Sequence, residues 1–275
     1  MNRVGFACVL SLFAVCIGCE DEDAKKKELL AKAGVGDSGT TSASASAAAI
    51  TPSTAAASAS AAPAVKPPKE CPSGTEVTFD DPDLETEVRL KLNKLDKEKN
   101  PKITTADLAQ VKSINLAKKA NLDEIDPCIF PKFTGLHHLY LGPGKYRDLK
   151  PISSLTQLES LRASISEVED LKPLEKLVLL DRLDLGRTHV RDIAGLEPLV
   201  NVTELSLDDT QISDLKPLAK MAKLEKLSIR NTTVTDVSPL KDLKKLKVLD
   251  VKGCAISNLD TIQPLVGRGL KIVTK

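Results

Sequence analysis

Few residues of this 275-residue chain are suited to catalysis. None of its three histidines stands in a nucleophile pattern with a serine or a cysteine (His137, His138 and His189). The sequence contains no HExxH zinc motif, no phosphate-binding Walker loop and no GxSxG nucleophile elbow. The segment Gly142-Pro143-Gly144 is typical of a turn at the end of a strand rather than of a phosphate loop. We therefore expect a protein that is not an enzyme and that holds no metal and no cofactor.

The chemistry of Cys19 is the exception. An apolar run of 14 residues, 4–17, follows Arg3 and is shorter than the roughly 20 residues that a bilayer-spanning helix needs, so it is typical of a signal-peptide core. Its end, Cys16-Ile17-Gly18-Cys19, resembles the cleavage box of bacterial lipoproteins, although Cys16 stands where that family usually has Leu. The resemblance implies a signal peptide over residues 1–19 and lipidation of Cys19. Ordinary signal-peptidase cleavage, with Cys19 incidental, is the alternative.

The next segment, residues 20–70, is expected to be a tether. It opens with the acidic cluster 20–23, and from Gly34 to Lys69 it consists mainly of Ala, Ser, Thr and Pro. Such a composition buries too little apolar surface to offset the entropy lost on ordering. Together with a lipid-modified Cys19, it predicts a domain held at a bacterial cell envelope, on its periplasmic face or at the cell surface. Several acyl chains give stable attachment to a membrane.

Residues 71–110 are expected to form an N-terminal helical cap. Asp81-Pro82 has the form of a helix N-cap followed by proline at the first helical position. The apolar residues that follow are spaced as one helical face (Leu84, Val88, Leu92 and Leu95). Thr104-x-x-Asp107 predicts the start of a second, short helix that carries Leu108. Cys71 and Cys128 lie at the two ends of this region; they form either a disulfide, in an oxidising compartment, or two isolated thiols.

A repeat of 22 residues is the strongest signal in the chain. Its pattern, LxxLxLxxTxIxDLxPLxxL, keeps the same columns apolar through six copies, one of which is Leu139, Leu161, Leu183, Leu205, Leu227 and Leu249. This is the signature of a leucine-rich repeat. An irregular earlier copy contains Ile114, which gives seven strands, and residues 270–273 have the form of a truncated last strand.

The spacing dictates the fold class. In each LxL segment both leucines point to one side of a strand, and no single repeat can bury that side alone. The proline in most second halves restricts the return to a short turn. We therefore predict an α/β fold: a right-handed leucine-rich-repeat solenoid over residues 111–275, with a parallel concave sheet, short convex turns and the N-terminal helical cap. Small residues in one column are expected to bond to turn backbone inside the solenoid (Ser166, Thr188, Thr210, Thr232 and Cys254).

Residues 77–275 resemble the internalin-like class of bacterial leucine-rich-repeat proteins. The resemblance rests on the 22-residue period, on the half-repeat Ile-x-Asp-Leu-x-Pro-Leu and on the cap segments Phe79–Leu84 and Ile103–Leu108. Internalins bind host receptors through the concave face, so the resemblance implies recognition of a protein or peptide there. Intracellular relatives that regulate phosphatases share the period, but the export signal argues against that role.

The outward strand positions are where a ligand is expected. The candidate ligand-binding residues on this face are His138, Tyr140, Arg162, Arg182, Glu204 and Arg230. Charges of opposite sign neighbour one another in these columns, so the face is either a set of exposed ion pairs, each worth about 0–1 kcal/mol, or a polar recognition surface. His138 and Tyr140 form the one aromatic cluster on it, and tyrosine is favoured at binding hot spots.

The expected partner is a protein or peptide bound by an envelope-anchored module. A structural envelope protein that recognises glycan or cell-wall polymer is the alternative, but a single tyrosine on the face gives a sugar few aromatic platforms. The net charge of +1 gives no general attraction to nucleic acid. We therefore expect no nucleic-acid partner. Contact with a membrane is expected through the lipid anchor.

Overall fold

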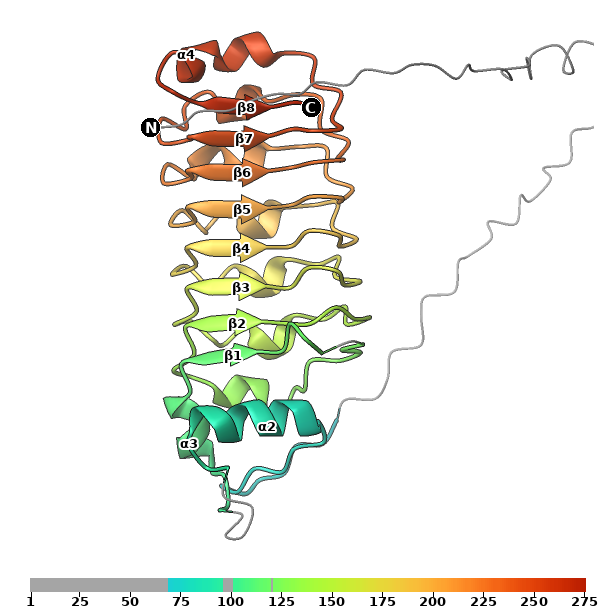
Figure 1. Cartoon of the computed structure of the whole chain (residues 1–275), viewed down its shortest axis with the longest axis vertical. Helices are drawn as coiled ribbons and strands as arrows, with labels where there is room; N and C mark the ends of the chain where they lie inside the picture. The colour runs from blue at the N-terminus through green and yellow to red at the C-terminus, as the bar shows by residue number, and fades with distance from the viewer. Residues whose placement is uncertain (1–68, 96–100, 120) are drawn as a thin grey trace, which may run out of the picture. The chain divides into compact units, whose positions relative to one another are not determined.

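A single parallel sheet runs through the whole of the folded part (Figure 1). The structure, a computed structural model, describes residues 69–95, 101–119 and 121–275. The predicted signal peptide, its Cys19 and almost all of the predicted tether lie outside these residues. The described residues cover the predicted helical cap except residues 96–100, and the predicted repeats except residue 120.

The sheet has eight strands of three residues each, and they are paired in the order of the chain. They are β1 (Ser113–Asn115), β2 (His138–Tyr140), β3 (Ser160–Arg162), β4 (Arg182–Asp184), β5 (Glu204–Ser206), β6 (Lys226–Ser228), β7 (Val248–Asp250) and β8 (Lys271–Val273). The register aligns residues 22 apart from β2 to β7, as the repeat predicted. The truncated last segment is a full member of the sheet, so the strands number eight rather than seven. This is a leucine-rich-repeat solenoid.

Each strand from β1 to β7 is followed by a return that contains a short 3-10 helix, as the prolines predicted. These helices are η1 (Phe130–Lys132), η2 (Lys150–Ile152), η3 (Lys172–Leu174), η4 (Ala194–Leu196), η5 (Lys216–Lys220), η6 (Ser238–Leu240) and η7 (Leu259–Ile262). The aspartate of the half-repeat stabilises the start of each of the five helices η2 to η6. Its carboxylate accepts a hydrogen bond from the backbone N–H two residues later, at 2.7–3.0 Å (Asp148, Asp170, Asp192, Asp214 and Asp236). The sequence pattern contained this aspartate column, but its role becomes clear only in the structure.

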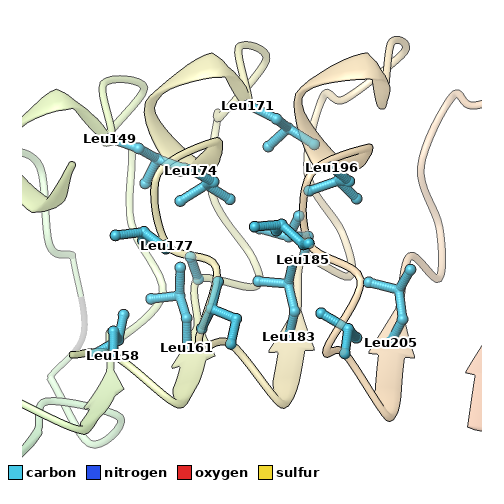
Figure 2. Close-up of a cluster of buried hydrophobic side chains, with 14 of the residues drawn as sticks. Leu149, Leu158, Leu161, Leu171, Leu174, Leu177, Leu183, Leu185, Leu196 and Leu205 are labelled. Carbon is cyan, nitrogen blue, oxygen red and sulfur yellow. The ribbon is translucent and has the colours of Figure 1, made fainter. Parts of the chain in front are cut away.

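The core lies between the sheet and the 3-10 helices. Both leucines of each LxL segment are buried, as are the apolar residues of the return, and together they form one continuous cluster. Figure 2 shows how this happens: Leu161, Leu183 and Leu205 stack from coil to coil behind the strands, facing Leu174 and Leu196 from the helices. Since each fully buried leucine contributes about 1.5–3 kcal/mol, the stack of coils stabilises itself layer by layer.

The first end of the stack is covered by two helices, α2 (Pro82–Lys91) and α3 (Thr105–Gln110). Both predicted caps are confirmed: the Asp81 carboxylate accepts from the first turn of α2, and Thr104 and Asp107 form a reciprocal capping box. The apolar face predicted for the first helix is wrong at its last residue, Leu95. The helix stops at Lys91 because Asn93 is left-handed (φ 54°), which turns Leu95 out to an exposed position.

A disulfide joins the cap to the first return. It links Cys71 to Cys128 with their Cα atoms 5.2 Å apart, the first of the two arrangements that the sequence left open. Lys69 adds a second link, since its Nζ lies 2.8 Å from Asp126 and 2.6 Å from Asp80. These hydrogen bonds raise the pKa of Lys69 above its ordinary value. The segment before α2 is thereby held against the solenoid.

The other end is covered by α4 (Gln263–Val266), which follows η7 directly. Ile262, Leu265 and Leu270 are buried there and close the last apolar layer. A solenoid needs a cover at each end, because its last apolar layers would otherwise be exposed to water. Here α2 and α3 cover one end, and α4 covers the other. Residues 69–275 therefore contain the core and both of its covers.

The turns after the strands, at the strand-end edge of the sheet, share an unusual backbone conformation. One residue in each of five successive coils has a positive φ of 53–77° (Ile165, Arg187, Asp209, Asn231 and Gly253). Glycine and asparagine adopt this conformation readily, whereas for a β-branched residue it is an outlier. The repeat thus imposes the same turn on Ile165 as on Gly253.

The predicted column of small residues fills the inside of these turns. The hydroxyls of Ser166, Thr188, Thr210 and Thr232 each donate to the carbonyl three residues earlier, at 2.7–3.0 Å. Cys254 ends the column: its Sγ lies 2.9 Å from the Ile229 carbonyl and 3.3 Å from the Thr232 hydroxyl. Cys254 is only half-buried, less than the sequence predicted, because no further turn of this kind packs over it within the described residues.

Candidate functional site

The solvent-facing side of the strands forms a shallow groove, here called the strand-face groove. It has a volume of about 470 Å³ and crosses β2 to β7. Its outward side chains are Tyr140, Ser160, Arg162, Arg182, Asp184, Glu204, Ser206, Lys226, Ser228, Val248 and Asp250. Because residues alternate along a strand, the positions on either side of each inward leucine lie on this side of the sheet; both such positions of β3 to β7, and Tyr140 of β2, line the groove.

Four of the six predicted ligand-binding residues line the groove: Tyr140, Arg162, Arg182 and Glu204. His138 lies on β2 but not in the groove lining, and Arg230 lies two residues beyond β6. The groove also includes outward residues that the sequence did not single out as candidates, namely Ser160, Asp184, Ser206, Lys226, Ser228, Val248 and Asp250. Their signal was available, because they stand in the same 22-residue columns as the residues that were chosen.

Charges in the groove are paired along the stack. Arg162 Nε lies 3.3 Å from an Asp184 oxygen on the next strand, and Lys226 Nζ lies 2.7 Å from a Glu204 oxygen. Most of these side chains are well exposed, so each pair contributes little to folding and can be replaced by contacts with a ligand. The charge pairs predicted from the columns are therefore present, and they leave the groove close to neutral.

Arg182 is the least engaged cation of the groove. Its nearest carboxylate oxygen belongs to its chain neighbour Asp181, at 3.7 Å, and its side chain is 64% exposed. Among the described residues it makes no ion pair with Glu204, although the two are paired in register. Arg182 is consequently free to meet a ligand carboxylate or carbonyl near the middle of the groove.

Arg230 has a structural partner instead. Its guanidinium donates to Asp208 from Nε (3.0 Å) and Nη2 (2.7 Å), and its backbone N–H donates to the other oxygen at 2.8 Å. Ser228 donates to the same carboxylate at 2.5 Å. Burial alone would raise the pKa of Asp208, but the hydrogen bonds from Arg230 and Ser228 outweigh it and lower that pKa. These contacts fix Arg230 to the strand-end edge.

The aromatic end of the groove is formed by β2. Tyr140 and His138 are both half-buried and project from the same side of the strand. His138 Nδ1 is buried without a hydrogen-bond partner among the described residues, while His137 Nδ1 lies 3.7 Å from a Glu159 oxygen. Tyr140 thus gives the groove one amphipathic ring at its first strand.

No group of three metal-ligating side chains gathers within residues 69–95, 101–119 and 121–275. In the same part of the chain, no helix has both the length and the apolar character that crossing a bilayer demands. The side chains that line the groove offer hydrogen bonds, charges of both signs and one tyrosine ring.

Comparisons with known proteins agree with the fold. A family model described as "Leucine Rich repeats (2 copies)" matches residues 200–241 and 222–265. The crystal structure of internalin C2 from Listeria monocytogenes is similar, with a TM-score of 0.59 and 24% sequence identity over 72% of this chain and 94% of that chain. A second Listeria monocytogenes internalin, inlF, gives a TM-score of 0.57 and 20% identity over 71% of this chain and 63% of its own length. A search of curated protein sequences finds no significant match.

Proposed function

We propose that the strand-face groove binds a segment of a partner protein, and that the chain is a recognition module rather than an enzyme. The observation that carries this proposal is the groove itself, which runs across six strands and is lined by side chains of mixed character. A leucine-rich-repeat solenoid holds these side chains on a rigid sheet, so binding costs little ordering of the protein. The fold of the two internalins supports a role in binding, and the contacts of this chain are argued from its own residues.

The two ends of the groove suit different parts of such a segment. Tyr140 at β2 offers an apolar ring with a hydroxyl, and Val248 at β7 offers an aliphatic contact. Between them, Arg182 is available for a carboxylate or a backbone carbonyl, because no other strand engages it. Proteins supply all three kinds of group in one stretch of chain, whereas a glycan would require more aromatic rings than the one that lines this groove.

The experiment is capture of a partner by residues 69–275 and by matched variants. Immobilised wild-type protein is exposed to envelope extracts and to neighbouring cells, and captured proteins are identified by mass spectrometry. Tyr140→Ala and Arg182→Glu are expected to reduce capture of the same partner at least about tenfold, since hot-spot residues typically contribute 2 kcal/mol or more. Replacement of His138 together with Tyr140 tests whether the aromatic pair on β2 adds to the contact made by Tyr140 alone.

Lys172→Glu is the control, because Lys172 is exposed on η3, on the opposite side of the solenoid from the strands. It should capture the partner as well as the wild type does. Capture that survives Tyr140→Ala and Arg182→Glu without loss would place the binding surface elsewhere and reject the groove.

We further propose that the domain is displayed at a bacterial cell envelope through lipidation of Cys19. The support is the sequence around Cys19, with its apolar run and its lipoprotein-like cleavage box. Cells that express the full chain should incorporate radiolabelled palmitate, and Cys19→Ala should abolish the label. An unlabelled wild-type protein would refute the anchor while leaving the groove proposal intact.

A further inference from the structure

A second surface lies where the chain leads into the strands, here called the strand-start edge. It consists of the loops before β4 to β8, at residues 178–181, 200–203, 222–225, 244–247 and 266–270. Figure 1 shows these loops aligned along the side of the sheet at which the arrows begin. Backbone hydrogen bonds of 2.8 Å join each to the next, from Thr203 N–H to Asp181 C=O, from Glu225 to Thr203 and from Lys247 to Glu225. The edge is therefore a rigid row rather than a set of independent loops.

The row begins with aliphatic side chains. Val178, Leu179 and Val200 are 43–44% exposed, and they account for three of the seven exposed large hydrophobic residues in the part of the chain that the structure describes. The Asn201 amide donates to the Val178 carbonyl at 2.8 Å, which fixes these two coils side by side. Exposed aliphatic residues in adjacent coils form a patch, and patches of this kind mark contact sites.

The row continues with cations. Lys223, Lys244, Lys245 and Arg268 are exposed, and none of them makes an ion pair within the described residues. Lys223 Nζ lies 2.8 Å from the Asn201 side-chain oxygen, so the basic part of the row directly adjoins the aliphatic part.

The acids of the row do not neutralise these cations. Glu225 is engaged by Lys247 at 2.7 Å, and Asp181 lies in the coil of β4, 3.7 Å from Arg182. Asp242 is exposed just before the loop at 244–247 and offsets one charge. The edge thus carries an excess of positive charge over the coils of β6 to β8, although the whole chain has a net charge of only +1.

We propose that the strand-start edge lies on an anionic lipid bilayer. Coils spaced about 4.8 Å apart place the cations in line, which suits a flat surface of phosphate headgroups. The adjoining valines and leucine enter the boundary between headgroups and acyl chains, as the apolar face of an interfacial helix does. This contact uses an edge of the sheet and leaves the strand-face groove open, so it does not depend on the function proposed for that groove.

Sedimentation with vesicles tests the proposal. Residues 69–275, which lack Cys19, are mixed with phosphatidylcholine vesicles that do or do not contain phosphatidylglycerol. The wild type should sediment only with the anionic vesicles, and less at high salt, because salt screens the attraction. The variant Lys223→Glu, Lys244→Glu, Lys245→Glu should bind at least about tenfold more weakly, since each cation near such a surface contributes about fivefold.

A matched variant controls for net charge. Lys118, Lys145 and Lys172 are exposed elsewhere on the domain, and changing all three to Glu should leave vesicle binding within about twofold of the wild type. Circular dichroism spectra of all variants should agree, because every changed side chain is exposed. Equal loss of binding in the two charge variants would show a general charge effect and overturn the proposal.

The aliphatic part of the row separates a bilayer from other anionic partners. Val178→Ser, Leu179→Ser, Val200→Ser should weaken vesicle binding and leave binding to soluble heparin unchanged. If these substitutions do not affect vesicle binding, or if the wild type fails to sediment with anionic vesicles, the edge does not lie on a membrane and the proposal fails.

Discussion

At the strand-end edge of the sheet, one coil after another repeats the same contacts, whereas at the strand-start edge the side chains change from coil to coil. The first edge has the left-handed residue and the buried hydroxyl in each of its middle turns. The second has Val178 in one coil and Lys244 at the equivalent position three coils later. Where side chains complete the turns of the solenoid, the same residue types recur from coil to coil. Where side chains are exposed and make no such contact, they can vary and can bind a partner.

The largest difference between the edges is expected for two glycines. A Cβ on Gly144, at the strand-end edge, would overlap the Leu122 carbonyl group, whereas a Cβ on Gly267, at the strand-start edge, would meet nothing closer than the Pro264 carbonyl at 3.7 Å. Gly144→Ala should therefore lower the free energy of unfolding by more than about 3 kcal/mol. Gly267→Ala should change it by less than about 1 kcal/mol. Urea denaturation of both variants measures this, and equal effects would remove the distinction between the edges.

The next largest effect is expected at Asp208. Its buried carboxylate accepts from Ser228 and Arg230, so Asp208→Ala leaves several donors without their partner and should cost about 2–3 kcal/mol at neutral pH. Because the pKa of Asp208 is lowered in the folded state, its contribution is complete above the ordinary carboxyl pKa of about 4 and is lost as the pH falls through the folded-state value.

The comparison for Asp208 is Asp181→Ala at the strand-start edge. Asp181 accepts from the Thr203 hydroxyl and lies at a half-buried position, so the loss should be about 1 kcal/mol or less. Urea denaturation from acid to neutral pH should show the difference between wild type and Asp208→Ala shrinking towards low pH. A difference independent of pH would mean that packing, not the charge, accounts for the effect.

A third effect appears in alkali. Burial raises the pKa of Tyr146 to about 12, against about 10 for a tyrosine in the unfolded chain. The unfolded state therefore loses this proton first, and stability falls between about pH 10 and 12 by roughly 2 kcal/mol. Tyr146→Phe should remove this part of the alkaline loss, and Tyr140→Phe should retain it. Thermal unfolding across this pH range gives the measurement; parallel curves for wild type and Tyr146→Phe would contradict the prediction.

The sequence predicts the buried side of the solenoid better than it predicts the contacts of the exposed side chains. The leucine columns specify the strands and their register, because only inward residues at a fixed period can bury one another. They do not show that Arg230 is bound by Asp208, or that Arg182 meets only its chain neighbour Asp181, since such choices depend on which neighbouring carboxylate a long side chain reaches. The groove was therefore predicted in position, but only part of its lining was chosen.

Leu95 and Ile165 illustrate two other reasons why sequence patterns fail. Leu95 fits a helical spacing, but a left-handed Asn93 ends the helix before the pattern does. Ile165 gives no sign of a turn that requires positive φ, because the neighbouring coils, not its own preference, impose that conformation. In both cases the backbone of a local turn overrides the side-chain pattern.

The smallest expected effect is a gain in stability at Ile165. Its φ of 59° is unfavourable for a β-branched residue, and its side chain is 43% exposed, so little packing compensates for the strain. Asn231 occupies the equivalent position in the third coil after that of Ile165, with the same left-handed backbone. Ile165→Asn should therefore raise the free energy of unfolding by about 0.5–1 kcal/mol.

Val200→Asn is the matched substitution at the strand-start edge, where an equally exposed aliphatic residue has no positive φ. It should change stability by less than about 0.5 kcal/mol, as surface substitutions usually do. If Ile165→Asn instead destabilises the domain, its side chain makes contacts that outweigh the strain. Side-chain packing, and not only the backbone of the turns, would then account for the repeated conformation at the strand-end edge.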